Sequence, residues 1–422
     1  MKEFTTEGLY PIRINDKEGY IDNTGKIVIN PKYEMASTFA WGIAKVAIRP
    51  EKHETNCIVS VSGDYVFPLW GFINKFGDSV SDFIFDHLPF QFSKNKELIA
   101  AETEGRWGYI HQCFGKAHGY WPAIVEVGYI VKPTFDDAAS CFSEGLACVK
   151  KDGKWGYIKD DFLYGLQRVP IDKTGDYAIA PKFDDANNFS EGLASVMIGK
   201  PESFTKDIHY YIPKQNGKWG YIDMTGTFII SPQFDAAGSF SEGLAPVKRD
   251  GKWGFIDKNG NFIIKPQYDD ASCFIENLAY VKIDGKYGYI DKYGKFFIKP
   301  KFDSAEPFID GIAIIKQADK YYYISKNLKS NKLFKSLRPW KKITNIGFDQ
   351  AIPFCFGLAA VSIDGKYGYI NNNGEFAIKP QYEEAHSFIG ELAPIMQQGK
   401  FHYINKQGKI IWTSEEFPYI WY

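Results

Sequence analysis

Ligand-type side chains stand close together at His111, Cys113 and His118 in this 422-residue chain. Imidazole nitrogen and thiolate sulfur are ligands that zinc prefers, but a structural zinc site needs four ligands in tight pairs. A fourth ligand and that pairing are missing here, which disfavours a metal site. If the chain were an enzyme, a pocket would be expected where this segment meets Asp160.

Two further sets of residues could do chemistry, because paired carboxylates can act as acid and base and exposed tryptophan rings can stack on sugars. The acidic pairs are Asp136-Asp137, Asp184-Asp185, Asp269-Asp270 and Glu383-Glu384, and the tryptophans are Trp70, Trp107, Trp155, Trp219 and Trp253. Both sets recur at regular places along the chain, which favours structural roles in turns and packing. The sequence contains no GxSxG, HExxH or phosphate-binding loop. We therefore expect no enzyme activity and no cofactor.

A segment from Ser325 to Gly347 stands out because it is rich in basic residues and contains no acidic residue. Apolar residues interleave with its positive charges, a pattern typical of a loop that contacts an anion or a partner. The alternative is a solvated lysine-rich loop. The candidate binding residues are Lys326, Lys329, Lys332, Lys335, Arg338, Trp340, Lys341 and Lys342.

These segments interrupt an internal repeat of 34 residues, most regular between residues 244 and 311. Ten copies begin at Leu9, Ile43, Leu98, Leu146, Leu193, Leu244, Leu278, Ile312, Leu358 and Leu392. Clear units cover residues 244–311 and 358–412, whereas the units over 43–243 and 312–357 carry insertions. We expect one repeat array over residues 1–422, because a unit this short buries a core only by stacking on its neighbours.

Each unit predicts three short strands. The first alternates apolar and polar residues, and the Asp-Gly or Asn-Gly that follows, as at Asp250-Gly251, is typical of a type I′ hairpin. The second strand contains Trp-Gly, as at Trp253-Gly254, where the missing Cβ indicates a close neighbour. A tryptophan ring is the natural candidate for that neighbour. The third strand ends at a proline such as Pro266, which cannot donate to a ladder.

The Lys-Trp-Gly-Tyr-Ile-Asp core at 218–223 and its variant with Phe255 at 252–257, followed by an Ile-Lys-Pro and a Phe-Asp-x-Ala segment or close variants of them, resemble the bacterial WG (KWG) repeat. The resemblance covers nearly the whole chain and implies an all-β protein that mediates binding, with no single activity attached. Two overall shapes remain open. An open curved array or solenoid is preferred because no blade shared between the termini is evident; the alternative is a closed propeller-like ring.

The amino-acid composition limits the classes of partner that we expect the protein to bind. The 50 basic and 51 acidic residues give a net charge of −1, so no global field attracts nucleic acid or an anionic membrane. Few of the basic residues are arginine, which weakens nucleic-acid reading. The scattered cysteines, the absent apolar leader and the absent apolar run favour a cytoplasmic bacterial protein. We expect a scaffold that binds another protein through inserted loops. A glycan or cell-wall module, or anion or nucleic-acid sensing through residues 325–347, is the alternative.

Overall fold

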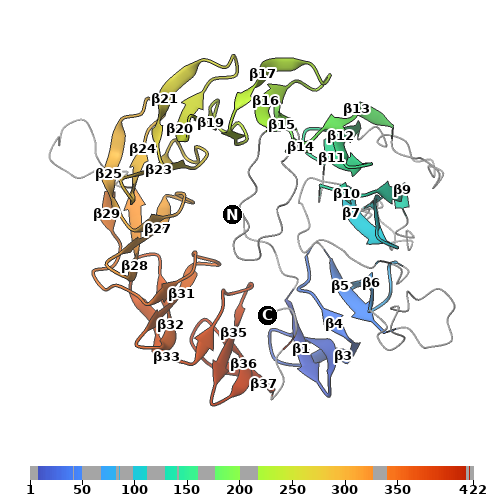
Figure 1. Cartoon of the computed structure of the whole chain (residues 1–422). Helices are drawn as coiled ribbons and strands as arrows, with labels where there is room; N and C mark the ends of the chain where they lie inside the picture. The colour runs from blue at the N-terminus through green and yellow to red at the C-terminus, as the bar shows by residue number, and fades with distance from the viewer. Residues whose placement is uncertain are drawn as a thin grey trace, which may run out of the picture. The chain divides into compact units, whose positions relative to one another are not determined.

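The computed structural model (Figure 1) describes residues 8–40, 42–49, 68–81, 85, 98–111, 129–139, 142–159, 176–199, 217–326, 340–414 and 418. Every regular element in these ranges is a β-strand. The ranges contain no helix long and apolar enough to cross a membrane.

The strands form ten small sheets in chain order, here named blades 1 to 10. Blades 1 to 5 contain β1 (Leu9–Ile14), β2 (Lys17–Asp22), β3 (Ile27–Tyr33); β4 (Met35–Ala36), β5 (Ile43–Ile48), β6 (Leu69–Asn74); β7 (Leu98–Thr103), β8 (Arg106–His111), β9 (Tyr129–Phe135); β10 (Asp137–Ala138), β11 (Leu146–Lys151), β12 (Lys154–Lys159), β13 (Tyr177–Phe183); β14 (Asp185–Ala186), β15 (Ala194–Ile198), β16 (Lys218–Ile222), β17 (Phe228–Phe234). Blades 6 to 10 contain β18 (Ala236–Ala237), β19 (Ala245–Arg249), β20 (Lys252–Ile256), β21 (Phe262–Tyr268); β22 (Asp270–Ala271), β23 (Ala279–Ile283), β24 (Lys286–Ile290), β25 (Phe296–Phe302); β26 (Ser304–Ala305), β27 (Ile312–Gln317), β28 (Lys320–Lys326), β29 (Trp340–Lys342); β30 (Gln350–Ala351), β31 (Leu358–Ile363), β32 (Lys366–Asn371), β33 (Phe376–Tyr382); β34 (Glu384–Ala385), β35 (Leu392–Gln397), β36 (Lys400–Asn405), β37 (Ile410–Ser414).

The predicted hairpin is confirmed in the units whose first turn the structure describes, as blade 6 shows. Strands β19 and β20 pair antiparallel, with Lys248 opposite Trp253. The turn residues Asp250 and Gly251 have φ of 52° and 78°. Both positive values are those that a type I′ turn needs, so the Asp-Gly signal set the hairpin correctly.

The glycine of the Trp-Gly pair does face a close neighbour, but that neighbour is backbone. A Cβ on Gly254 would lie 2.6 Å from the Ile264 oxygen and 2.7 Å from the Pro266 nitrogen. The pairing of β20 with β21 is irregular at this point, because a β-bulge brings the third strand toward the glycine. The expectation of a tryptophan ring there is wrong. Proline fits this place since it has no N–H to leave unpaired.

Three strands per unit is an underestimate for most blades. The Asp-x-Ala that ends one repeat forms a two-residue strand that pairs with the first long strand of the next blade, as Asp185–Ala186 does with Val196–Met197. Each such blade therefore takes one strand from the preceding repeat. Two residues have no periodicity to detect, and their pairing crosses the repeat boundary, so the sequence pattern did not reveal them.

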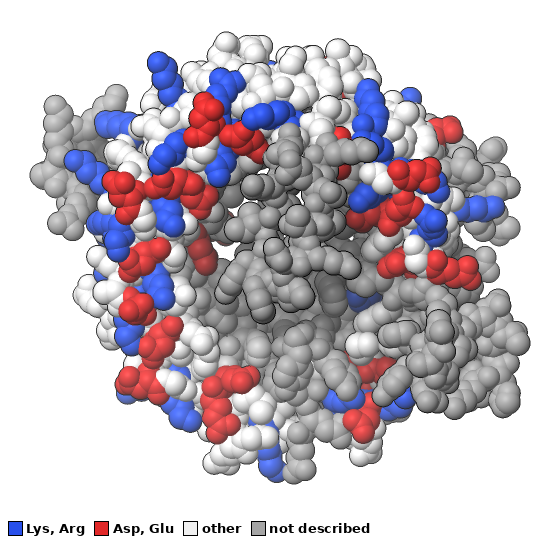
Figure 2. All heavy atoms as spheres, viewed as in Figure 1, with Lys and Arg blue, Asp and Glu red and all other residues white. Residues whose placement is uncertain are grey.

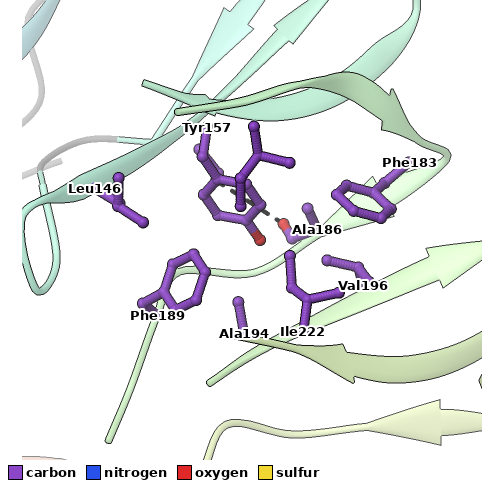
Figure 3. Close-up of a cluster of buried hydrophobic side chains, with 10 residues drawn as sticks. Leu146, Tyr157, Phe183, Ala186, Phe189, Ala194, Val196 and Ile222 are labelled. Atoms are coloured by element: carbon purple, nitrogen blue, oxygen red, sulfur yellow. Dashed lines mark hydrogen bonds between the residues drawn. The ribbon is translucent and has the colours of Figure 1, made fainter. Parts of the chain in front are cut away.

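The expected stacking of units is confirmed where blades 4 and 5 meet. Tyr157 and Leu146 of blade 4 pack in one cluster with Phe189, Val196 and Ile222 (Figure 3). The Tyr157 and Phe189 rings lie 4.9 Å apart, edge to face. Blade 4 thus completes its core with apolar side chains of blade 5, as a repeat unit that stacks on its neighbour does.

The chain folds into two compact units. The first unit contains residues 1–129, 319–325 and 341–422, and the second contains 130–318 and 326–340. Blades 1, 2, 9 and 10 lie wholly in the first unit and blades 4 to 7 wholly in the second.

Within the first unit, blade 1 packs directly against blade 10. Tyr10, Ile12 and Ile21 share a buried cluster with Phe401 and Tyr403. The Tyr403 hydroxyl also donates to the Pro11 oxygen at 2.9 Å. The chain is thus a tandem array of ten propeller-type blades. Contact between the first and the last blade supports the propeller-like ring, which was the alternative, rather than an open array with separate ends.

Candidate functional site

The repeated motif residues pair with one another inside each blade. Trp155 lies opposite Lys150 on the neighbouring strand, with the lysine nitrogen 5.7 Å from the ring centroid. Trp219 is buried and lies opposite Met197. The tryptophans of the described ranges are buried or half-buried. Packing is therefore their role here, and they do not form an open row of ring faces.

The recurring carboxylates act as local clamps, as the repeat pattern predicted. One oxygen of Asp235 accepts from Lys218, and the other accepts from the Gly251 N–H of the hairpin turn. The Lys218 hydrogen bond is the largest cause that lowers the pKa of Asp235. The charged form of Asp235 is thus stabilised by a cation and a turn N–H, which is a structural role in this blade.

The buried tyrosine of the second strand ties each blade to the chain segment that leads into the next. Tyr157 donates to the Asn187 oxygen at 2.7 Å, and Tyr221 donates to the Gly238 oxygen at 2.8 Å. Burial raises the pKa of both hydroxyls. They stay protonated donors at neutral pH.

A row of glutamates makes a second link between blades in the second unit. Glu144 has a positive φ of 54°, and its carboxylate accepts from the Glu191 and Gly192 N–H groups at 2.7 and 2.8 Å. Glu191 bonds the Gly243 N–H in the same way and also pairs with Lys258. These carboxylates are occupied by the protein's own amides and lysines.

The described residues of the basic segment are anchored in their blades. Trp340 is buried against Phe302, with ring centroids 6.1 Å apart, and Lys301 lies 4.2 Å from the Trp340 ring centroid. This is the place that Phe262 takes beside Phe234 in blade 6. Trp340 is thus a core residue of the third strand in this blade, and its place in the candidate binding set stays a prediction.

The lysines at the two ends of the segment differ. Lys326 bonds the Glu276 carboxylate at 2.8 Å. Lys342 lies over the Tyr322 ring at 3.4 Å from its centroid, and burial lowers its pKa. Lys341 is exposed. The remaining candidates, which are Lys329, Lys332, Lys335 and Arg338, lie outside the described residues.

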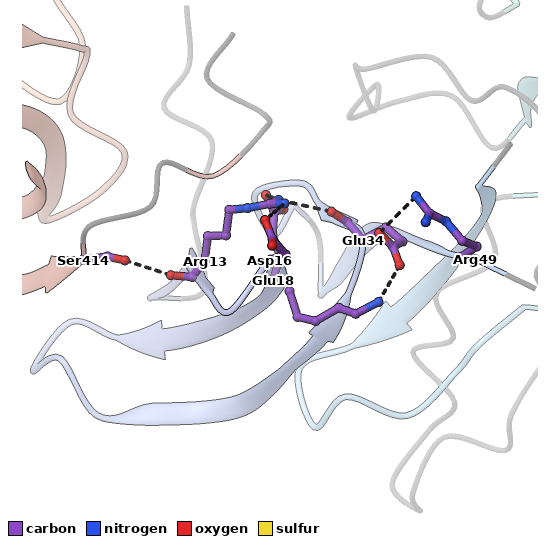
Figure 4. Close-up of polar contacts among 7 residues, drawn as sticks. Arg13, Asp16, Glu18, Glu34, Arg49 and Ser414 are labelled. Carbon is purple, nitrogen blue, oxygen red and sulfur yellow. Dashed lines mark hydrogen bonds and ion pairs between the residues drawn. The ribbon is translucent and has the colours of Figure 1, made fainter. Parts of the chain in front are cut away.

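A polar cluster in blade 1 was not predicted from the sequence. Glu18 stands where other units have tryptophan; it is fully buried, and its carboxylate lies 3.3 Å from Arg13 (Figure 4). Arg13 also contacts Asp16 at 3.3 Å, and the second Glu18 oxygen accepts from the Ala36 N–H. The signal was available: the sequence Lys17-Glu18-Gly19 keeps the motif on both sides of the changed residue.

A second unusual cation is Lys45 in β5 of blade 2. It is buried, and its nitrogen lies 4.3 Å from the Trp70 ring centroid. Burial lowers the pKa of Lys45 to about 8. The equivalent residues in blades 4 and 5 are Cys148 and Ser195, which are small and neutral.

The described residues contain no group of three or more His, Cys, Asp or Glu side chains placed to hold a metal ion. Cys113, His118 and Asp160 lie outside the described ranges, so the zinc and pocket expectations stay untested. On the face shown in Figure 2, positive and negative side chains alternate among the described residues.

The inserts attach at both ends of the blade strands. Residues 160–175 join β12 to β13, the second turn of blade 4, whereas residues 200–216 join β15 to β16, the first turn of blade 5. Successive turns of an antiparallel meander lie at opposite strand ends. Even neighbouring inserts of the second unit therefore leave their blades from opposite sides.

Comparison with solved structures finds remote similarity to two proteins of known structure, among others. Hsv2p of Kluyveromyces lactis is 8% identical over 53% of this chain and 74% of its own, with a TM-score of 0.29. AztD of Citrobacter koseri is 10% identical over 90% of this chain and 92% of its own, with a TM-score of 0.34. Neither score carries a functional argument. No curated protein matches the sequence.

The family comparison is decisive where the structural one is not. The model of the WG containing repeat matches residues 19–48, 70–107, 128–155, 171–200, 219–253, 253–287, 287–321 and 367–401. These matches cover more than half of the chain and fall on the Trp-Gly hairpins and bulged strands described above. The chain belongs to the WG-repeat family.

Proposed function

We propose that this protein is a non-catalytic scaffold that binds another protein through loops inserted in its repeat array. One observation carries the proposal: the recurring polar and aromatic residues of the blades are used within the fold. Asp235 holds a lysine and a turn, Tyr157 holds the next blade, and Trp219 is buried. Recognition is then left to the segments that depart from the repeat, which a rigid frame presents.

The insert between β28 and β29 is the loop for which this argument is strongest. Its two flanks are fixed, one by the Lys326–Glu276 ion pair and the other by Trp340 on Phe302. Lys341 remains exposed beside it. Anchored ends reduce the entropy lost when a loop binds. The glycan alternative is weaker, since stacking on sugars needs open tryptophan faces.

The experiment replaces residues 327–339 with Asp-Lys-Asn-Gly, the turn found at 257–260 in blade 6. This variant keeps Lys326 and Trp340, so blade 8 retains its anchors. Partners are captured by cross-linking from the host and identified by mass spectrometry. The purified pair is then titrated by calorimetry. We expect affinity at least about tenfold weaker than wild type, equal to about 1.4 kcal/mol.

The matched control makes the same replacement at residues 160–175 in blade 4. Binding that survives both replacements would contradict the loop assignment. Association that falls steeply with salt and needs nucleic acid would instead support the anion-sensing alternative. Turnover of a small molecule by the purified protein would overturn the scaffold proposal itself.

A further inference from the structure

Blade 7 departs from the repeat at Tyr280 in β23, where the other blades of the second unit have smaller, neutral side chains. The equivalent residues of blades 4, 5 and 6 are Cys148, Ser195 and Pro246. Cys148 and Ser195 are buried, whereas Tyr280 is only half-buried. Because protein interiors are close-packed, the larger phenol ring does not fit entirely inside and stays partly accessible to solvent.

A second departure lies beside the first, at Glu306 in the segment that follows β26. Tyr280 lies opposite Tyr289 in the pairing of β23 with β24, and the Tyr289 hydroxyl donates to the Glu306 backbone oxygen at 2.7 Å. The residues at the Glu306 position before the first long strand of blades 4 to 7 are Ala139, Asn187, Gly238 and Ser272. An aromatic ring and an acid therefore replace small or neutral residues at one place in the second unit.

The charge of Glu306 is not neutralised within the described part of the chain. Burial raises the pKa of its carboxyl, and no cation among the described residues lowers it. The side chain as a whole is nevertheless exposed. Burial also raises the pKa of Tyr280, and the Asp270 and Glu306 carboxylates add to that effect. The phenol ring and the carboxylate therefore lie close together, and the carboxylate can be reached from solvent.

The groups around this pair leave one negative charge in excess. The Tyr280 and Tyr287 rings lie 5.7 Å apart at 78°, and the Tyr287 hydroxyl donates to Asp270 at 3.0 Å. The Lys282 nitrogen lies 5.2 Å from the Tyr287 ring centroid. Lys282 and Asp270 offset each other in charge, so Glu306 is the group that still lacks a cation.

We propose that Tyr280 and Glu306 form a binding site for an organic cation, which is an alkylammonium or guanidinium group. The face of a tyrosine ring attracts a cation, and a carboxylate accepts strong hydrogen bonds from one. A bound cation would also offset the cost of desolvating Glu306. The site lies on the blade framework and uses no residue of the insert between β28 and β29, so it goes beyond the loop-mediated binding proposed above.

The test titrates the full chain with n-butylammonium and methylguanidinium, followed by ligand-observed NMR, with n-butanol as the neutral probe. We expect both cations to bind and n-butanol not to bind. Glu306→Gln and Tyr280→Ser should each weaken cation binding at least about tenfold. Asp284→Asn is the matched control, because it removes an exposed negative charge from the hairpin turn of the same blade and should leave the affinity unchanged.

Thermal unfolding checks that the variants fold, and Glu306→Gln keeps the shape of the side chain and the backbone bond to Tyr289. The peptide N-acetyl-Gly-Lys-Gly-amide distinguishes two sources of the cation. Tighter binding than n-butylammonium assigns the site to a side chain of a partner protein, and weaker binding assigns it to a free amine. Unchanged affinity in Glu306→Gln, equal binding of n-butanol, or an equal loss in Asp284→Asn would overturn the proposal.

Discussion

Blade 6 and blade 1 are built on the same repeat but join their first two strands differently. In blade 6, Lys248 lies opposite Trp253, and both side chains are half-buried. In blade 1, Arg13 lies opposite Glu18, and both side chains are buried. The aromatic contact of one blade is replaced by a buried ion pair in the other.

The difference shows that the repeat specifies pairs rather than single residues. Lys150 faces Trp155 and Met396 faces Phe401 at this place, so a cation or a flexible apolar chain accompanies an aromatic ring. In blade 1 the carboxylate of Glu18 takes the place of the aromatic ring, and the residue opposite is Arg13, whose guanidinium forms an ion pair with that carboxylate. A change at one of the two positions alone should therefore be costly, and most of all where the pair is buried.

The largest effect is expected from Glu18→Ala in blade 1. The substitution leaves the Arg13 charge buried and deprives the Ala36 N–H of its acceptor. Loss of one partner from a buried ion pair costs about 3–5 kcal/mol. Urea unfolding followed by circular dichroism measures the loss.

The double variant Arg13→Lys with Glu18→Trp converts this pair to the one found in blade 6. If the repeat specifies residue pairs, the double variant should recover at least half of the free energy of unfolding that Glu18→Ala loses. A double variant no better than Glu18→Ala would show that blade 1 depends on the ion pair for another reason.

The next largest effect on stability is expected at the position that follows the motif tryptophan, which is Gly254 in blade 6 and His402 in blade 10. Gly254→Ala should destabilise the protein by about 3 kcal/mol, because the new Cβ meets the Ile264 and Pro266 backbone. In blade 10 the same position is His402, and β37 pairs with β36 without a bulge there. His402→Ala loses only the ring contacts with Thr413 and Gln397 and should cost about 1 kcal/mol.

Thermal and urea unfolding of both variants measure this difference. Equal costs would mean that the bulge of blade 6 can relax away from a side chain. The close approach of the Pro266 backbone would then not require a glycine at position 254.

The blade was predictable from sequence because its signals are local. Asp250-Gly251 specified the hairpin. The expectation that the third strand ends at Pro266 is wrong, because β21 continues to Tyr268. The two-residue strand was not predictable, since Asp270–Ala271 pairs with the following repeat. The neighbour of Gly254 was not predictable either, because the β-bulge that brings it close depends on the register between β20 and β21 rather than on one residue.

The candidate site was harder to predict, because its residues lie where the repeat is interrupted. Trp340 was assigned to the basic loop since the insert before it hides its equivalence to Phe262. Counting back from Phe348-Asp349, which restores the repeat, would have placed it near the third strand. Glu18 was not predicted, although Lys17 and Gly19 keep the motif on both sides of it.

A smaller effect on stability, which depends on pH, is expected from the buried amine of Lys45 in blade 2. Burial lowers the pKa of this lysine to about 8, below its value in an unfolded chain. Between these two values the unfolded state binds more protons, so the free energy of unfolding rises with pH. We expect a rise of about 2 kcal/mol between pH 7.5 and 9.5.

Lys45→Met should abolish this rise, and urea titrations at several pH values measure it. Lys218→Met is the control, because that lysine is half exposed and paired with Asp235. A wild-type protein whose stability is flat over this range would contradict the inferred cost of burying the amine.

The smallest effect is expected at the exposed ion pair of blade 5. Asp235→Asn removes the partner of Lys218, and exposed pairs of this kind contribute at most about 1 kcal/mol. The pKa of Asp235 is lowered, chiefly by Lys218, so its contribution is present above the unfolded pKa and is lost as the pH falls through the folded one. Wild type and variant should therefore converge in stability in acid. An Asp235→Asn loss as large as that of Glu18→Ala would mean that burial does not separate the two pairs, and the contrast between blade 1 and the regular blades would then need another cause.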